Sequence, residues 1–251
     1  MAKQTITIAG NLDIPLDMTT LALWDRFTPY LERTPDWQHY LEFQGGNFAD
    51  SVAKRIRHLS LAHMLRHVML KGLNGQIAEC GVSRGHSAYI AAHVLREFSF
   101  GSAFYLFDSF KGFREAHPED LDVPAGHVDV FNQQKALKDG TKRFDYGIKP
   151  AQEALKDFEF VRFMPGWIPD RFHEVANESF VFVNIDLDLY EPTRKSLEFF
   201  YPRLIEGGII HFDDYNTADW PGTNTAVNEY LHCNPPSLFY PLPLSGAFLM
   251  K

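Results

Sequence analysis

Two aspartates, Asp186 and Asp188, directly follow a run of apolar residues in the stretch FVFVNIDLDLYEPT, residues 180–193. The apolar run suits the centre of a buried sheet, and side chains two residues apart on an extended strand point to the same face. We therefore expect the two carboxylates to lie side by side where the strand ends. Carboxylates this close repel each other unless a positive group is near, so the stretch predicts a cationic partner.

A second acidic pair, Asp213 and Asp214 in IIHFDDYN, ends the next apolar strand of the chain. The segment between the two pairs is long enough for one crossover helix, so the strands can be parallel neighbours. Open parallel sheets bind ligands at the carboxyl edge of their strands, and we expect Asp186, Asp213 and Asp214 to converge there. Carboxylate oxygens suit Mg2+ or a similar divalent ion. The alternative is a set of solvated aspartates at strand ends.

A glycine loop, ECGVSRGHS, places Gly81 and Gly85 between an apolar strand and a helix. Glycine lets a ligand approach the backbone, and the free N–H groups of a helix N-terminus suit a carboxylate or a phosphate. The dinucleotide fingerprint needs a third glycine, which this loop lacks. Asp108 ends the following strand, where an acidic side chain can accept hydrogen bonds from ribose hydroxyls. Without a ligand, the same residues would form a tight turn and a surface aspartate.

Alternating strands and helices must position these side chains. Apolar runs predict five strands, with helical patterns between most of them, in the stretches GQIAEC, SAFYLFD, FEFVRFMPG, SFVFVNID and GGIIHFDD, at about residues 75–80, 102–108, 158–166, 179–186 and 207–214. This alternation favours a mainly parallel sheet covered on both faces. The C-terminal stretch SLFYPLPLSGAFLMK predicts two antiparallel strands that turn at Ser245 and Gly246. The helix after the fourth strand is expected to run to Gly207.

We expect two parts in the chain. Residues 1–72 form a helical N-terminal extension that covers the active site, with Leu61, Leu65 and Val68 on one stripe. Residues 73–251 form the main domain. Within it, about residues 114–149 are polar, irregular and too long for an ordinary connection, and we interpret them as a mobile lid.

Composition narrows the classes of function. Of 251 residues, 32 are acidic and 24 basic, and the basic residues form no cluster of the kind that follows a phosphate backbone, so no nucleic-acid partner is expected. Cys80 and Cys233 make neither a disulfide framework nor a zinc site. The chain has no signal-peptide pattern and no apolar run that could span a bilayer. We expect a soluble, cytoplasmic protein without a membrane partner.

Three stretches resemble, in order, the motifs of the macrocin O-methyltransferase (TylF) family: GQIAECGVSRGHSAYIAA, YLFDSFKGF and VNIDLDLYEPTRKSLEFFYPRLIEGGIIHFDDY. The resemblance covers about residues 75–215. It implies the α/β, Rossmann-like sandwich of class I methyltransferases, with a mainly parallel seven-stranded sheet, helices on both faces and an antiparallel C-terminal strand pair. It also implies S-adenosylmethionine as the cofactor, Mg2+ as the metal and a homodimer.

The resemblance also implies roles for individual residues at the cofactor. Glu79 is expected near the amino group of the methionine part, Ser87 near its carboxylate, and Asp108 at the ribose. The other residues that the resemblance assigns to cofactor binding are Gly81, Ser109, Gly166 and Trp167.

The resemblance further implies which acidic residues take part in the reaction. Asp186, Asp213 and Asp214 correspond to magnesium ligands, with Asp186 also counted as catalytic. Asp188 corresponds to a general base that has been proposed in relatives. Catechol O-methyltransferase has a lysine where Leu189 stands here, so a lysine base is excluded at this position.

The expected reaction is magnesium-dependent transfer of the methyl group of S-adenosylmethionine to a hydroxyl of a sugar, in a glycosylated natural product or a similar small molecule. Because magnesium can chelate two adjacent oxygens, a vicinal diol is the expected acceptor feature, and Asp188 is expected to accept the proton. A catechol-type phenol is the first alternative, and Phe131, Phe144 and Tyr146 in the lid would suit either acceptor. The remaining alternatives are an NAD-dependent oxidoreductase and a non-catalytic binding protein.

Overall fold

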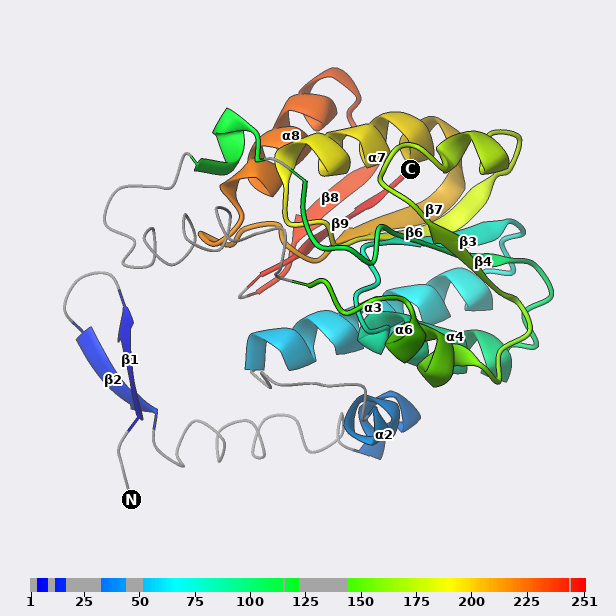
Figure 1. Ribbon diagram of the computed structural model, residues 1–251, viewed down its shortest axis with the longest axis horizontal. Helices are drawn as coiled ribbons and strands as arrows, with labels where there is room; N and C mark the ends of the chain where they lie inside the picture. The colour runs from blue at the N-terminus through cyan, green and yellow to red at the C-terminus, as the bar shows by residue number, and fades with distance from the viewer. Residues whose placement is uncertain are drawn as a thin grey trace.

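A seven-stranded sheet between two layers of helices forms the centre of the molecule (Figure 1). The computed structural model describes residues 4–8, 12–16, 33–43, 52–114, 116–121, 144–243 and 245–251. One face of the sheet is covered by α7 (Tyr190–Arg203) and α8 (Pro221–Cys233). The other face is covered by α3 (Val52–Leu70), α4 (His86–Glu97) and α6 (Lys149–Leu155). The predicted α/β sandwich with helices on both faces is confirmed.

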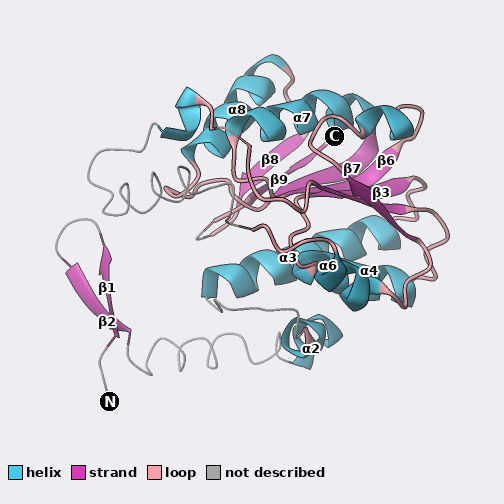
Figure 2. Cartoon of the chain, in the orientation of Figure 1, coloured by secondary structure: helices cyan, strands magenta, loops and turns pink. Residues whose placement is uncertain are grey.

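The strands of this sheet, drawn in magenta in Figure 2, follow the order β5-β4-β3-β6-β7-β9-β8. The first five along the chain are parallel: β3 (Gln76–Cys80), β4 (Phe104–Asp108), β5 (Val161–Pro165), β6 (Phe180–Ile185) and β7 (Leu204–Phe212). The last two, β8 (Leu238–Pro241) and β9 (Ala247–Met250), add to β7 as the predicted antiparallel pair. Since β4 lies on one side of β3 and β6 on the other, the strand order reverses at β3, where such sheets bind ligands at their carboxyl ends.

The end of α7 differs from the prediction. The helix stops at Arg203 rather than at Gly207, and Leu204 already pairs with Phe180 as the first residue of β7. Pro202 weakens the last helical turn because it has no backbone N–H to donate, and Leu204 already has the extended backbone of a strand, with φ −69° and ψ 130°. Leu204, which the prediction placed inside the helix, is therefore buried as part of a strand.

The N-terminal extension is helical only in part. Residues 4–16 contain an antiparallel pair, β1 (Gln4–Ile8) and β2 (Leu12–Leu16), so the helical prediction is wrong there. The stretch QTITI alternates threonine and isoleucine, and this period of two with β-branched residues favours a strand. The extension continues with α2 (Pro35–Glu42) and α3. Residues 17–32 and 44–51 lie outside the described part.

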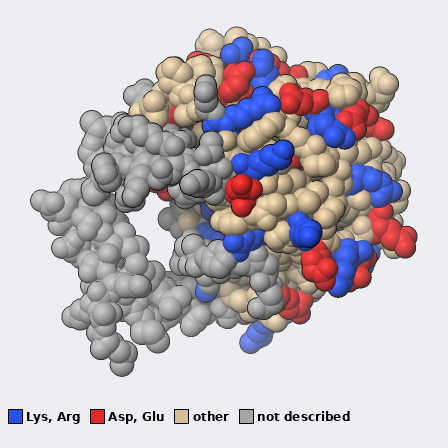
Figure 3. Space-filling model, viewed as in Figure 1, with Lys and Arg blue, Asp and Glu red and all other residues tan. Residues whose placement is uncertain are grey.

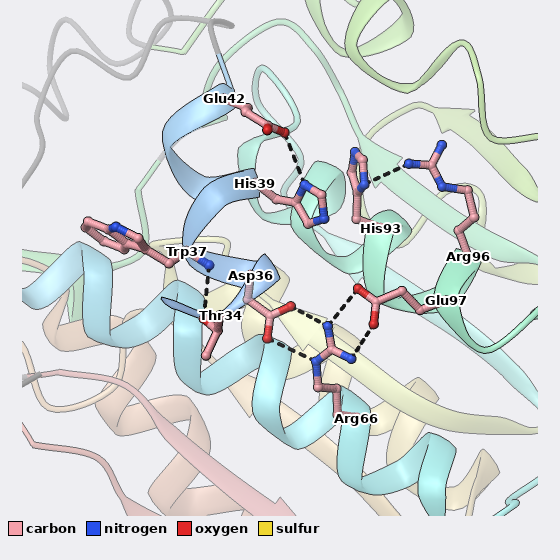
Figure 4. A network of polar contacts seen from close by, with 9 residues as sticks. All are labelled: Thr34, Asp36, Trp37, His39, Glu42, Arg66, His93, Arg96 and Glu97. Carbon is pink, nitrogen blue, oxygen red and sulfur yellow. Dashed lines mark hydrogen bonds and ion pairs between the residues drawn. The ribbon is translucent and has the colours of Figure 1, made fainter. Parts of the chain in front are cut away.

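Ionic contacts fasten α2 to the main domain (Figure 4). Arg66 of α3 donates to both carboxylate oxygens of the buried Asp36, at 2.6 and 3.0 Å, and also to Glu97 of α4, at 2.6 and 2.9 Å. Thr34 caps the start of α2 by accepting a hydrogen bond from the Trp37 backbone N–H. One arginine thus joins three helices.

The predicted lid is described only at its two ends. Phe113, just before the lid, and Phe144, near its C-terminal end, meet with ring centroids 5.2 Å apart. The short helix η2 (Pro118–Leu121) packs against α8. Residue 115 and residues 122–143, which include Phe131, lie outside the described part.

Acidic and basic side chains are interspersed on the face of the described surface shown in Figure 3. Among the helices that the structure describes, none combines the length and the apolar character needed to cross a membrane.

Candidate active site

The glycine loop and the first acidic stretch are in direct contact at the switch point. Gly81 follows β3 with φ +90°, and a Cβ atom added to it would lie 1.6 Å from the backbone oxygen of Asp186. The backbone N–H of Asp186 donates to the carbonyl of Cys80 at 2.8 Å, which continues the β3–β6 pairing by one step. Any side chain at position 81 would push the two segments apart. Glycine is therefore required here for the loop and the acidic residues to adjoin.

A polar row crosses the sheet just before this edge. Glu79, Asn184 and His211 are register partners on β3, β6 and β7, and all three are buried. Ser87 Oγ donates to Glu79 Oε1 at 2.6 Å, and a ring nitrogen of His211 lies 2.7 Å from Asn184 Oδ1. Burial, more than any other effect, raises the pKa of Glu79 to about 8, and the bond from Ser87 opposes this rise. A carboxyl group in this state is ready to become charged when a cationic group binds beside it.

Asp108, predicted at the ribose, holds the glycine loop. Its Oδ2 accepts hydrogen bonds from the backbone N–H groups of Val82 and Ser83, each at 2.7 Å, and its Oδ1 accepts one from Phe110 at 2.6 Å. A carboxylate has about four acceptor positions, so it retains capacity for a further donor. The structure thus places Asp108 beside the loop, and its ribose role stays a prediction.

The other predicted cofactor residues lie on neighbouring strand ends. Ser109 follows Asp108 and donates to the Gly112 carbonyl at 3.1 Å. Gly166 follows β5, and its backbone N–H donates to the Asp108 carbonyl at 2.9 Å. Trp167 comes next, with the guanidinium of Arg114 4.9 Å from its ring centre. The strand ends of β3, β4 and β5 thus bring the predicted cofactor residues onto one edge.

Three aspartates converge at the neighbouring strand ends. Asp186, Asp188 and Asp214 each offer a carboxylate oxygen, and these oxygens lie within 4.8 Å of one another. The backbone N–H of Asp188 donates to Asp214 Oδ2 at 2.9 Å, and Asp188 has φ +62°, in the left-handed region that aspartate tolerates better than most residues. Asp213, the third metal ligand predicted from the sequence, precedes Asp214 in the chain, but its carboxylate forms an ion pair with a basic side chain instead.

That partner is Arg57 of α3, which sequence reasoning missed. Its Nη1 lies 3.2 Å from Asp213 Oδ2 and donates to Ser245 Oγ at 3.1 Å. The cationic partner expected for the aspartates is thus present within the chain itself. The sequence did contain one indication. Arg57 lies four residues before Leu61, so it is on the same side of the helix as the apolar stripe and faces the main domain rather than solvent.

The aspartates perturb one another strongly. The pKa of Asp186 is raised well above its ordinary value, first by burial and then by the charges of Asp213, Asp214 and Asp188, while Arg57 opposes the rise. The pKa of Asp214 is raised to about 6 by burial and by Asp213. A cation bound beside these carboxylates would stabilise their charged form, and carboxylate oxygens are ligands that Mg2+ prefers. The side chains present therefore fit a divalent metal.

A second residue missed by sequence reasoning is Asp120, in the described start of the lid. Its buried carboxylate accepts hydrogen bonds from the backbone N–H of Tyr190 at 2.7 Å and of His117 at 2.8 Å. Tyr190 begins α7, whose own N-cap, Leu189, has no side chain able to accept such a bond. Asp120 therefore caps α7 from far away in the sequence and holds the turn that carries Asp188.

Comparison with known proteins shows the family of the chain. A model of the macrocin O-methyltransferase (TylF) family matches residues 41–235. The chain belongs to this family. The family predicted from the sequence motifs is therefore confirmed, and the match extends beyond those motifs into the N-terminal extension.

Two curated relatives and one solved structure illustrate the similarity. Mycinamicin III 3''-O-methyltransferase of Micromonospora griseorubida is 29% identical over 172 residues, 68% of this chain and 66% of the relative. The 8-demethyl-8-(2,3-dimethoxy-alpha-L-rhamnosyl)-tetracenomycin-C 4'-O-methyltransferase of Streptomyces olivaceus is 30% identical over 162 residues, 62% of this chain and 59% of the relative. This chain thus spans less than two thirds of the length of either relative. The structure of the O-methyltransferase NovP matches with a TM-score of 0.66 at 22% identity, over 85% of this chain and 88% of that one, which supports the Rossmann-like methyltransferase fold.

Proposed function

We propose that this protein is a magnesium-dependent O-methyltransferase that transfers the methyl group of S-adenosylmethionine to a hydroxyl of a sugar, in a glycosylated natural product or a similar small molecule. One observation carries the proposal: the glycine loop touches the acidic strand end through the contact of Gly81 with the Asp186 backbone. A methyl donor held by the loop and a hydroxyl held at the aspartates would therefore be neighbours, as an in-line transfer requires. Family membership supports the same reaction.

Some residues at the strand ends would bind the cofactor, and others would bind the metal. When bound, S-adenosylmethionine supplies an electrophilic methyl group and Mg2+ supplies a Lewis acid that lowers the pKa of a coordinated hydroxyl. Glu79 would hold the ammonium group of the cofactor and Asp108 the ribose, from positions on adjacent strands. Asp186 and Asp214 would hold the metal, with Asp213 as the third ligand.

Asp188 would accept the proton of the acceptor hydroxyl. Its carboxylate lies among those of Asp186 and Asp214, and its left-handed backbone turns it away from the regular path of β6. The same closeness would also allow Asp188 to bind the metal in place of Asp213. The two roles have different consequences, because a lost ligand weakens metal binding whereas a lost base slows turnover.

The acceptor is expected to present two adjacent oxygens. The name of the Streptomyces olivaceus relative describes transfer to the 4' oxygen of a rhamnosyl group that carries methoxy groups at positions 2 and 3. In that relative the neighbouring oxygen is thus already methylated. We therefore propose, for this chain, a sugar hydroxyl whose neighbour is either a hydroxyl or a methoxy oxygen.

Methyl transfer with the purified protein tests the proposal. We expect turnover with S-adenosylmethionine and a rhamnosyl or similar glycoside, its loss with a chelator, and its return with Mg2+. Full activity in the chelator would refute the metal, and binding of NAD instead of S-adenosylmethionine would refute the cofactor. A catechol in the same screen tests the phenol alternative, and sedimentation of the protein tests the homodimer that the resemblance implies.

Asp188→Asn separates the two roles of that residue. As a base, its loss should lower kcat by about 10²–10⁴-fold and leave Mg2+ affinity, measured by calorimetry, nearly unchanged. Asp213→Asn is the matched variant and should weaken Mg2+ binding. If Asp188→Asn weakens Mg2+ binding and Asp213→Asn does not, Asp188 is the third ligand and the base lies elsewhere.

A further inference from the structure

Arg57 is the charged group of α3 that reaches the aspartates. Its guanidinium contacts Asp213 at 3.2 Å and Ser245, in the turn between β8 and β9, at 3.1 Å. The Arg57 side chain is 21% exposed and that of Asp213 10%, so water screens the pair only weakly. Three elements distant in sequence therefore meet at one cation.

The charges around this guanidinium are one-sided. Arg57 interacts electrostatically with all four aspartates of the two strand ends, Asp186, Asp188, Asp213 and Asp214. Ser245, on the remaining side, is neutral. A divalent ion at the oxygens of Asp186, Asp188 and Asp214 would thus share its carboxylates with a cation that already belongs to the protein.

We propose that Arg57 is an internal counter-cation of the four aspartates: it stabilises the metal-free site and opposes the binding of Mg2+. Two cations attracted to the same carboxylates repel each other, and the Ser245 contact keeps the guanidinium from moving away freely. This inference rests on the metal binding of the proposed function. It assigns Arg57 a role in setting the affinity of the metal site, through Asp213.

Arg57→Gln in the full chain tests the inference, because glutamine keeps a hydrogen-bond donor and removes the charge. By calorimetry, we expect this variant to bind Mg2+ more tightly, roughly tenfold, which corresponds to a coupling of about 1.4 kcal/mol. Without metal, its melting temperature should fall below that of wild type, and Mg2+ should raise it by a larger increment. Arg57→Lys, which keeps the charge, should retain an affinity close to wild type.

Arg55→Gln is the matched control. Arg55 lies on the same helix and its guanidinium stacks on Trp37, 5.0 Å from the ring centre. This substitution also removes one positive charge from α3. Mg2+ affinity should stay within about twofold of wild type, because the contact of Arg57 with Asp213, rather than the net charge of the helix, lowers the affinity for Mg2+.

The outcomes separate this inference from the proposed function. If wild type binds no Mg2+, both the metal of the proposed function and the role of Arg57 are wrong. If wild type binds Mg2+ and Arg57→Gln binds it equally or more weakly, only the counter-cation role is wrong. Should Arg57→Gln fail to fold, Ser245→Ala replaces it: freeing the guanidinium should raise Mg2+ affinity by roughly two- to threefold, and a lower affinity would contradict the inference.

Discussion

Replacing Glu79 by glutamine should make the metal-free protein more stable at alkaline pH. Glu79 is 1% exposed, and burial raises its pKa from 4.5 to about 8. Between these two pH values the folded state keeps a proton that the unfolded state has lost. The free energy of unfolding of wild type must therefore fall as pH rises through this window, whereas a glutamine contributes no such slope.

The size of the effect follows from the pKa difference. At about 1.4 kcal/mol per pKa unit, a rise from 4.5 to about 8 gives an upper limit of roughly 5 kcal/mol. Near pH 5 the two proteins should have similar stability, because protonated glutamate and glutamine are both neutral and both keep an acceptor for Ser87. The stability gained by Glu79→Gln should then grow with pH and level off above pH 8.

Urea unfolding at pH 5, 6, 7, 8 and 9 measures this gain in stability. The comparison requires that the slope of the unfolding free energy against urea concentration, the m-value, is equal in the two proteins. Glu206→Gln, at an exposed position of β7, is the control and should leave the pH profile of wild type unchanged. If the curves of Glu79→Gln and wild type run parallel from pH 5 to pH 9, Glu79 is not a buried neutral carboxyl group, and this reasoning is refuted.

Three further predictions concern the cofactor, the lid and the extension. S-adenosylmethionine binding near pH 7 should release up to one proton, because the ammonium group would lower the pKa of Glu79; calorimetry in buffers of different ionisation enthalpy measures the release, and Glu79→Gln should abolish it. Asp120→Ala should lower the free energy of unfolding by about 2 kcal/mol in urea and slow methyl transfer, because the Tyr190 N–H at the start of α7 loses its acceptor; unchanged stability and rate would show that the cap is dispensable. Arg66→Ala leaves the buried Asp36 without its partner and should lower the free energy of unfolding by about 3–5 kcal/mol. If α2 instead detaches from the domain, the loss should be smaller, and hydrogen exchange should become faster in α2 alone.

The sheet could be predicted from sequence because its signals are local. Continuous apolar runs such as that of β6, which is buried throughout, differ clearly from their polar flanks. The acidic residues at the strand ends were predictable as well, because they directly follow these apolar runs and because parallel strands share a carboxyl edge. The β1–β2 pair and the end of α7 were not, because a short alternation and a proline in a last turn are weak local signals.

Long-range partners could not be predicted in this way. Asp120 and Tyr190 are 70 residues apart, and nothing in either local sequence indicates a cap supplied from elsewhere. Arg57 stands among Lys54, Arg55 and His58, where a solvated helix face explains a basic residue equally well. Only the packing of α3 against the ends of β7 and the β8–β9 turn gives Arg57 its partner.

The position of α3 changes how the N-terminal extension should be understood. Its Leu61, Leu65 and Val68 are 1%, 0% and 0% exposed and belong to the same core cluster as Ile77 of β3. Burial of each such side chain contributes about 1.5–3 kcal/mol, so we infer that the boundary of the main domain lies before α3 rather than at residue 72. The same helix carries Arg57 to the aspartates. A truncation at residue 72 would thus remove part of the core together with a charge of the site, and loss of activity in it would not distinguish unfolding from a missing catalytic contribution.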